Sequence, residues 1–424
     1  MGSIIYLLLA VVACSSTATP SPTVVTSSGV PATPSPIATP SPTATATPSP
    51  IPTPSPTASP RPMAPATVKP GPAMTVARYG QAAVRLSDGR VLIMGGTVPF
   101  KGKCGMTCGN PSTAGVDVYD PSTGKFSPNG SLAEPRTGED ALLLNDGRVL
   151  VSGGDGESGG SLNTIEIYDP AQGTSVVVGP FIGVWETPSD PTVALLADGS
   201  VLIAGGSTDH DNTTSNATLI FDPASGGLSE GPLMAKPRQG ATATLLDDGR
   251  VLIAGGDYYQ GYYGYPNNNA ELIDPSQPLS QSTLLVSPDP ATSTRLPDGR
   301  VLIAGGSGSD TAASCPTPDV SEVFDPRTDE FTPTGPMSTP RRGSAAVKTQ
   351  DGRVVFFGGV DSGCKDVGTI EAFDPDSGTF QVVAKGFPTL TDSSATLLND
   401  GRILIAGGLV DYSQMTAATW LLKP

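Results

Sequence analysis

The sequence is poor in histidine, aromatic residues and positive charge. It has 1 His in 424 residues, 5% aromatic residues, and 24 Lys plus Arg against 40 Asp plus Glu, which gives a formal charge of −16. Such an acidic chain is not expected to bind nucleic acid or anionic lipid headgroups. With one His beside 5 Cys, a mixed zinc site is also disfavoured. No metal ion and no cofactor is therefore expected.

No apolar run is long enough for a permanent membrane helix. The longest at the N-terminus, residues 4–13, fits the apolar region of an export signal. Val11-Val-Ala-Cys14 resembles the lipobox of bacterial lipoproteins, which predicts lipidation of Cys14. No Lys or Arg precedes the run, so plain secretion stays open as the alternative. Residues 1–14 are therefore predicted to direct the protein to the outer face of the cell membrane or the cell surface.

Residues 15–65 consist almost entirely of Thr, Pro, Ser and Ala. A segment of this composition cannot bury a core and is typical of an extended, semi-stiff spacer. We expect it to hold the folded part of the chain away from a membrane or cell wall, and to be open to O-glycosylation.

The remaining chain, residues 66–424, is organised around one repeated stretch. Asp-Gly-(Arg/Ser) followed by four residues, all apolar except Ser152, and Gly-Gly occurs seven times, 49 to 58 residues apart; the copies begin at Asp88, Asp146, Asp198, Asp248, Asp298, Asp351 and Asp400. Asp-Gly suits a tight hairpin turn, and a continuous short apolar run suits a strand covered on both faces. A period near 50 residues indicates a propeller or an array.

Each unit also has a small, apolar strand before the turn and, in the first six units, an Asp-Pro turn after an aromatic or aliphatic residue, as in Tyr119-Asp-Pro. This combination resembles the kelch repeat. The resemblance implies an all-β, seven-bladed propeller of four-stranded antiparallel blades, and it is nearly silent on function.

The two ends of the repeat region complement each other. The seventh unit stops after its third strand, at Ala418–Leu422, whereas residues near Gly71–Met74 look like the end of a blade without its beginning. The N-terminal strand should therefore complete the last blade and close the ring, because closure removes exposed edges. The protein is expected to be a monomer.

Two groups of residues are candidates for ligand binding, in the variable loops and links. Arg occurs at matching places before four units, at Arg78, Arg136, Arg238 and Arg342, where it could attract an anion or, as we favour, hydrogen-bond neighbouring loops. The loop 257–269 carries five tyrosines, which could form a recognition surface or fold over their own blade: Tyr258, Tyr259, Tyr262, Tyr263 and Tyr265.

The cysteines other than Cys14 could form two disulfides in an oxidising compartment. Cys104 and Cys108 share one loop, and Cys315 and Cys364 lie in equivalent loops of adjacent units. The Gly-x-Ser-x-Gly match at Ser158 has no following helix, and a pairing of Ser158 with His210 is disfavoured. No catalytic residue is assigned.

The first functional hypothesis is a non-catalytic, exported propeller that binds a protein or carbohydrate at the cell surface. The alternative is an enzyme, oxidase- or hydrolase-like, with its site at the mouth of the central channel. Similarity to galactose oxidase and its relatives makes copper oxidase chemistry the obvious enzyme hypothesis. Members of that family bind copper with two histidines and two tyrosines, and this sequence offers only His210.

Overall fold

The computed structural model describes most of the chain beyond residue 62. Its described ranges are 63–100, 109–157, 160–180, 190–208, 213–260, 263–267, 269–277, 281–284, 292–306, 321–411 and 413–424. The chain divides into two units, Met1–Pro54 and Ser55–Pro424, and every described residue belongs to the second unit. The expected export signal, Cys14 and nearly all of the expected spacer lie outside the described residues.

The described part of the second unit is all-β and contains seven four-stranded antiparallel sheets. We number them sheet 1 to sheet 7 in the order of the sequence repeats. The first strands of sheets 1 to 7, which we call the inner strands, are β2 (Ala82–Arg85), β6 (Asp140–Leu143), β10 (Thr192–Leu195), β16 (Thr242–Leu245), β22 (Thr292–Arg295), β26 (Ala345–Lys348) and β31 (Ser394–Leu397). The second strands are β3 (Val91–Met94), β7 (Val149–Ser152), β11 (Val201–Ala204), β17 (Val251–Ala254), β23 (Val301–Ala304), β27 (Val354–Phe357) and β32 (Ile403–Ala406).

The third and fourth strands complete each sheet. The third strands are β4 (Thr113–Asp120), β8 (Thr164–Asp169), β14 (Thr218–Asp222), β20 (Asn269–Ile273), β24 (Ser321–Asp325), β28 (Thr369–Asp374) and β35 (Thr419–Lys423). The fourth strands are β5 (Lys125–Arg136), β9 (Thr174–Pro180), β15 (Gly227–Glu230), β21 (Gln281–Leu284), β25 (Glu330–Pro333), β29 (Thr379–Lys385) and, in sheet 7, β1 (Thr67–Pro70). The remaining short strands are β12 (Ser207–Thr208), β13 (Thr213–Thr214), β18 (Asp257–Gln260), β19 (Tyr263–Pro266), β30 (Leu390–Thr391), β33 (Leu409–Val410) and β34 (Gln414–Met415).

The repeated apolar run forms the second strand of each sheet. All four residues of every second strand are buried, as the sequence pattern predicts for a strand covered on both faces. The preceding Asp-Gly turn is held by its own side chains: Asp88 accepts hydrogen bonds from the backbone N–H of Arg90 at 2.9 Å and from its Nε at 2.7 Å. The sequence therefore specifies both the turn and the strand that follows it.

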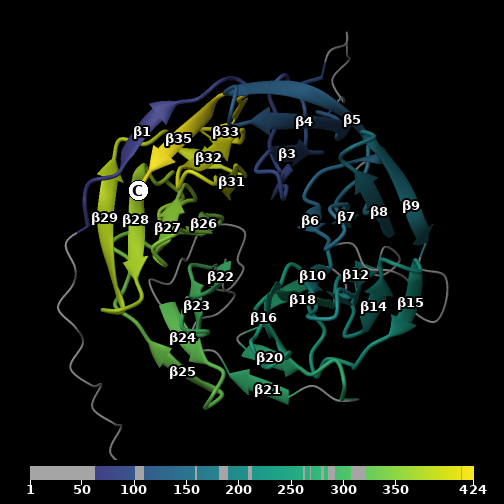
Figure 1. Ribbon diagram of the computed structural model, residues 1–424. Coiled ribbons are helices and arrows are strands. Elements are labelled where there is room, and N and C mark those ends of the chain that lie inside the picture. The colour runs from purple at the N-terminus through teal and green to yellow at the C-terminus, as the bar shows by residue number, and fades with distance from the viewer. Residues whose placement is uncertain are drawn as a thin grey trace, which may run out of the picture. The chain divides into compact units, whose positions relative to one another are not determined.

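The hydrophobic core lies between successive sheets. One cluster joins Val84 and Leu92 of sheet 1 to Val149 and Tyr168 of sheet 2. Another joins Ile93 of sheet 1 to Leu404 of sheet 7. In Figure 1 the sheets of this unit follow one another around a common centre, with the inner strands nearest to it.

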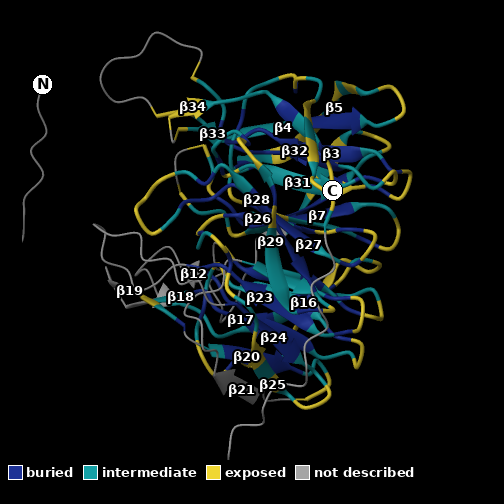
Figure 2. Cartoon of the chain, turned by 90° about the vertical axis from the view of Figure 1, so that its left-hand side faces the viewer, coloured by how far each residue is buried: buried dark blue, intermediate teal, exposed yellow. Residues whose placement is uncertain are grey.

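The expected all-β class with four-stranded antiparallel sheets is confirmed, and the arrangement is propeller-like. Strand β1 pairs antiparallel with β35, with Thr67 opposite Lys423 and Pro70 opposite Trp420. Within the described part, no helix has the length and apolar character required to cross a membrane. The side view in Figure 2 shows buried second strands in the interior and places the short strands β12, β18, β19, β33 and β34 toward one face.

Candidate functional site

Three of the four predicted arginines are buried in ion pairs. Arg78, Arg136 and Arg238 lie in the segments that enter sheets 1, 2 and 4, which we call the links. Their guanidinium groups pair with Asp117 at 3.6 Å, Glu166 at 2.7 Å and Glu271 at 2.6 Å, each an acid on the third strand of the same sheet.

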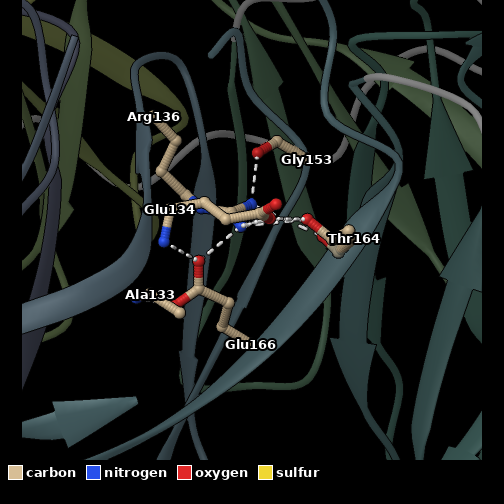
Figure 3. Close-up of polar contacts among 6 residues, drawn as sticks. All are labelled: Ala133, Glu134, Arg136, Gly153, Thr164 and Glu166. Carbon is tan, nitrogen blue, oxygen red and sulfur yellow. Dashed lines mark hydrogen bonds and ion pairs between the residues drawn. The ribbon is translucent and has the colours of Figure 1, made fainter. Parts of the chain in front are cut away.

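Arg136 illustrates the arrangement, which Figure 3 shows in close-up. Its Nη1 donates to the Gly153 carbonyl at 2.7 Å, and its Nη2 bonds Glu166 and the hydroxyl of Thr164. Glu166 in turn accepts the backbone N–H groups of Ala133 and Glu134 at 2.7 and 2.9 Å. Arg136 is 0% exposed, so this guanidinium has no surface for an anion. The contacts favour the structural alternative for these arginines.

The fourth position needs a correction. Arg342, the residue expected from the sequence, is exposed, whereas its neighbour Arg341 is fully buried and pairs with Glu371 at 2.6 Å. The shared pattern is Arg-x-Gly, as in Arg136-Thr-Gly138 and Arg341-Arg-Gly343. With two adjacent arginines the sequence analysis took the wrong one, because it aligned the Arg directly before the Gly.

The tyrosine-rich loop forms the hairpin β18–β19. Tyr258 and Tyr265 lie opposite each other and their rings stack, with centroids 5.1 Å apart and an interplanar angle of 24°. Tyr265 is 43% exposed. Tyr262 and the side chains of Tyr259 and Tyr263 fall outside the described residues. The pair thus offers one open aromatic face. This lies between the two alternatives for the loop, a recognition surface and a loop folded over its own blade.

A polar pocket, which the sequence analysis missed, lies where the links enter β6, β10 and β16. Its volume is about 270 Å³, and its lining residues are Thr137, Gly138, Gly154, Asp155, Ser161, Asp190 and Gln239. Asp155 accepts a hydrogen bond from the Ser161 hydroxyl at 3.1 Å, and its backbone N–H donates to the Thr137 carbonyl at 2.8 Å. Gly154 has a φ of 82°, and a Cβ there would stand 2.7 Å from the Thr137 carbonyl oxygen, so only Gly fits this wall.

The pocket is negatively charged, and its carboxyl groups influence one another. Surrounding protein raises the pKa of Asp190, and the charge of Asp155 raises it further. Asp140, at the start of β6, has its pKa raised to about 7, first by burial and then by Asp190. Both side chains keep contact with solvent, which screens part of these effects. Within the pocket, the surrounding protein and the Asp155 carboxylate thus favour the protonated form of Asp190, and the exposure of its side chain moderates this effect.

Asp190 also has an unusual backbone conformation. It has a φ of 60° at the link position that Gly occupies in Gly80, Gly138 and Gly240. Asp tolerates this left-handed region better than most residues, and such outliers concentrate at functional sites. A sequence signal was available, since aligning the links would have placed Asp190 where Gly80, Gly138 and Gly240 stand. Asp392 (φ 53°) takes the same position in the link to sheet 7.

The hairpin with the stacked tyrosines starts at the edge of this pocket. Gln239, which lines the pocket, exchanges backbone hydrogen bonds with Asp257, the first residue of β18, at 2.9 and 3.0 Å. The acidic pocket and the aromatic pair are therefore on connected segments of the chain.

A second pocket, of about 190 Å³, lies at the turns of sheets 5 and 6 and includes Asp298, Asp351 and Asp374. Asp298 and Asp351 pair with Arg300 and Arg353, and Asp374 accepts the backbone N–H of Asp376 at 3.1 Å. These carboxylates hold turns together, which makes this pocket the weaker candidate.

The remaining sequence candidates are covered only in part. Cys364 is disulfide-bonded, and its partner is not among the described residues; the pairing with Cys315 and the pairing of Cys104 with Cys108 stay predictions. Ser158 and His210 also fall in undescribed stretches. In the ranges that the structure covers, no group of three or more His, Cys, Asp or Glu could hold a metal ion.

Comparison with known proteins finds the same fold among solved structures. No family model matches the chain, and no curated protein does. Among solved structures, the chain is similar to a fungal alcohol oxidase of the AA5 family in complex with copper, with a TM-score of 0.62, 16% identity, and coverage of 84% of this chain and 76% of that one. At this identity the likeness concerns the fold.

This comparison contradicts the prediction of a non-catalytic binding protein. The solved structure that shares the fold belongs to an enzyme, which counts against a non-catalytic role as the first hypothesis. The repeats and turns of the sequence carry no sign of catalysis.

The residues of this chain do not fit a copper site of the expected type. Copper(II) favours imidazole ligands, and the sequence has one His. The inner strands carry Ala, Thr, Ser, Val and Leu, together with Asp140, Arg85, Arg295 and Lys348, and contain no Tyr or His.

Proposed function

We propose that residues 66–424 form a seven-bladed, kelch-type propeller closed by β1, and that this propeller is an enzyme. Seven sheets, contacts of β2 with both β6 and β31, the core cluster shared by sheets 7 and 1, and the pairing of β1 with β35 support the ring. Likeness to an alcohol oxidase supports an enzyme on this fold.

The site proposed is the polar pocket above β6, β10 and β16, at the mouth of the channel. One observation carries the proposal: Asp155 and Asp190 line a cavity of about 270 Å³ and interact electrostatically. A carboxyl group whose pKa is raised by a neighbouring carboxylate is a common means of acid–base catalysis. Thr137, Ser161 and Gln239 add hydrogen-bonding groups for a polar substrate.

The arrangement suits hydrolysis by general acid and base. Asp190, whose pKa is raised, would donate a proton to the leaving group. Asp155, positioned by Ser161, would accept the proton of an attacking water molecule. The exposed face of Tyr265 on the neighbouring hairpin would contact the distal part of the substrate.

The alternative enzyme activity is that of an oxidase. The fold likeness favours it. The ligand set argues against it, because a single His cannot supply two imidazoles. We therefore place hydrolysis first.

Export and anchoring complete the proposal. The apolar residues 4–13 would act as a signal, and Cys14 would carry the lipid that holds the propeller at the cell surface through the spacer of residues 15–65. The expected carbohydrate or protein partner becomes the class of substrate to be tested.

The test is hydrolysis of chromogenic glycosides, esters and amides by the purified protein and by Asp155→Asn and Asp190→Asn. Each substitution should reduce kcat by about 100-fold or more, and wild-type activity should fall as rising pH deprotonates Asp190. Glu330→Gln, an exposed acid on β25, serves as the matched control and should keep full activity. Full activity in both Asn variants, or no turnover of any of the three substrate classes, would overturn the proposal.

A further inference from the structure

Gln81 and Glu139 occupy equivalent places in two links. Each is the third residue after a buried arginine, Arg78 or Arg136, and each directly precedes an inner strand. Both side chains are buried, with 7% and 6% of their surface exposed. The repeat therefore presents a neutral amide and an acid in one structural position.

Gln81 joins sheet 1 to sheet 7 as a hydrogen-bond donor. Its side-chain Nε2 donates to the Ala406 carbonyl at 2.8 Å and lies 3.2 Å from the Ser394 hydroxyl. Ser394 and Ala406 are opposite each other on β31 and β32. The amide thus spans the junction between the two sheets.

Glu139 has the same relation to sheet 1. The backbone N–H of Ala82 points to its Oε1 at 3.4 Å, and Ala82 lies opposite Met94 as Ser394 lies opposite Ala406. The carboxyl group packs against Gly95, as the Gln81 amide packs against Gly407. At this position the Gln81 amide is a hydrogen-bond donor to a backbone carbonyl. An ionised Glu139 carboxylate could only accept, and its Oε2 has no hydrogen-bond partner among the described groups.

The positive charges nearest to Glu139 are already engaged. These are Arg136, paired with Glu166, and Arg78, paired with Asp117. Burial raises the pKa of Glu139 to about 8, outweighing the backbone N–H groups of Glu139 and Ala82 and the attraction of the two arginines, all of which lower it.

We propose that Glu139 is a neutral carboxylic acid that donates a hydrogen bond across the junction of sheets 1 and 2, as Gln81 does at the junction of sheets 7 and 1. Ionisation in alkaline solution removes the donor and leaves a buried charge, so the junction weakens. The effect reaches the polar pocket, because Thr137 and Gly138 of the same link line it and Gly154 packs on the Glu139 backbone. Glu139 thus makes a pH-sensitive contact between sheets 1 and 2 next to the candidate site, and its role does not depend on the reaction proposed there.

The direction of the pH dependence follows from proton binding. Between the ordinary value of 4.5 and about 8 the folded state holds a proton that the unfolded state releases. Rising pH in this window therefore favours unfolding by up to tenfold in the equilibrium constant per pH unit. The contribution is fully present below this window and is lost by its upper end.

The experiment compares urea unfolding of the wild type, Glu139→Gln and Gln81→Glu from pH 5 to 9.5. The free energy of unfolding of the wild type should fall relative to that of Glu139→Gln from pH 5 to 8. Above pH 8 the difference between the two proteins should stay constant. Raised carboxyl groups such as Asp140 and Asp190 act equally in both proteins and cancel in the difference. Gln81→Glu should add a second loss of the same sign.

Infrared spectra provide a readout of protonation itself. The carbonyl stretch of a protonated carboxyl group should be present at pH 6.5 in the wild type and reduced in Glu139→Gln. A wild type and Glu139→Gln that differ by a constant amount at every pH would overturn the proposal, as would identical infrared bands. If Gln81→Glu does not fold, the comparison of wild type and Glu139→Gln decides alone.

Discussion

At the scale of the residue, the residue type at the buried arginine position of a link is related to the residue type that faces it on the third strand of the same sheet. Sheets 1, 2, 4 and 6 pair a buried link arginine with a buried acid. In sheet 7 the corresponding residues are Leu390 and Trp420, which belong to one apolar cluster. In these five sheets the two positions are therefore filled either by opposite charges or by apolar groups, since one buried charge alone is costly. Sheet 5 departs from this rule, because it has the buried acid Glu322 on its third strand and no Arg or Lys in residues 285–291.

This coupling makes the Arg238–Glu271 pair a test of the assignment. Arg238→Met should destabilise the protein by about 3–5 kcal/mol, because Glu271 is left as a buried charge without its cation. Arg238→Met combined with Glu271→Leu should recover much of this loss. Arg342→Met, at an exposed arginine, should change stability by no more than about 0.5 kcal/mol. Urea denaturation measures all three, and a single Arg238→Met variant as stable as the wild type would contradict the structural role.

At the scale of the element, prediction from sequence succeeds where the repeat is strict. The turn and second strand recur with the same residues, so their position and burial could be stated for all seven units. The hairpin β18–β19 was not predicted, because the loops that follow Gly-Gly differ in length and residues from unit to unit; β12–β13 and β33–β34 are its shorter counterparts. The pocket was missed for a related reason: Thr137, Asp190 and Gln239 are about 50 residues apart, and only an exact alignment of the links brings them together.

The pairing of β1 with β35 yields a prediction for a whole element. Deleting residues 66–76 should expose the edge of β35 along Trp420–Lys423, where β1 now supplies hydrogen bonds. The variant should unfold at lower urea concentration and should aggregate. Size-exclusion chromatography and a melting curve measure this, with deletion of residues 40–50, in the spacer, as the control. A variant that melts and elutes like the parent would show that β1 does not close the ring.

At the scale of the whole molecule, the charge and the ligand inventory restrict the chemistry. The chain carries a formal charge of −16, and the link residues Arg78, Arg136, Arg238 and Arg341 form internal ion pairs, whereas Arg342 is exposed. The lining residues that the structure describes include Asp155 and Asp190 and no Lys or Arg, which suits proton transfer to neutral or cationic substrates rather than the binding of anions. The fold is shared with a copper enzyme, whereas the side chains differ in kind.

That difference gives the last prediction. The protein should neither retain stoichiometric copper nor oxidise primary alcohols, because two imidazoles are the ligands that such a site needs and His210 is the only one in the sequence. Carboxylates would form a harder and weaker site with a different redox potential. The purified protein is incubated with copper, dialysed, analysed for metal, and assayed for peroxide release with galactose and with glyoxal, beside His210→Ala and Tyr258→Phe. Weak copper that is lost on dialysis, equally in all three proteins, is the expected result. Tight one-to-one copper with turnover that either substitution abolishes would establish the oxidase and displace hydrolysis as the proposed reaction.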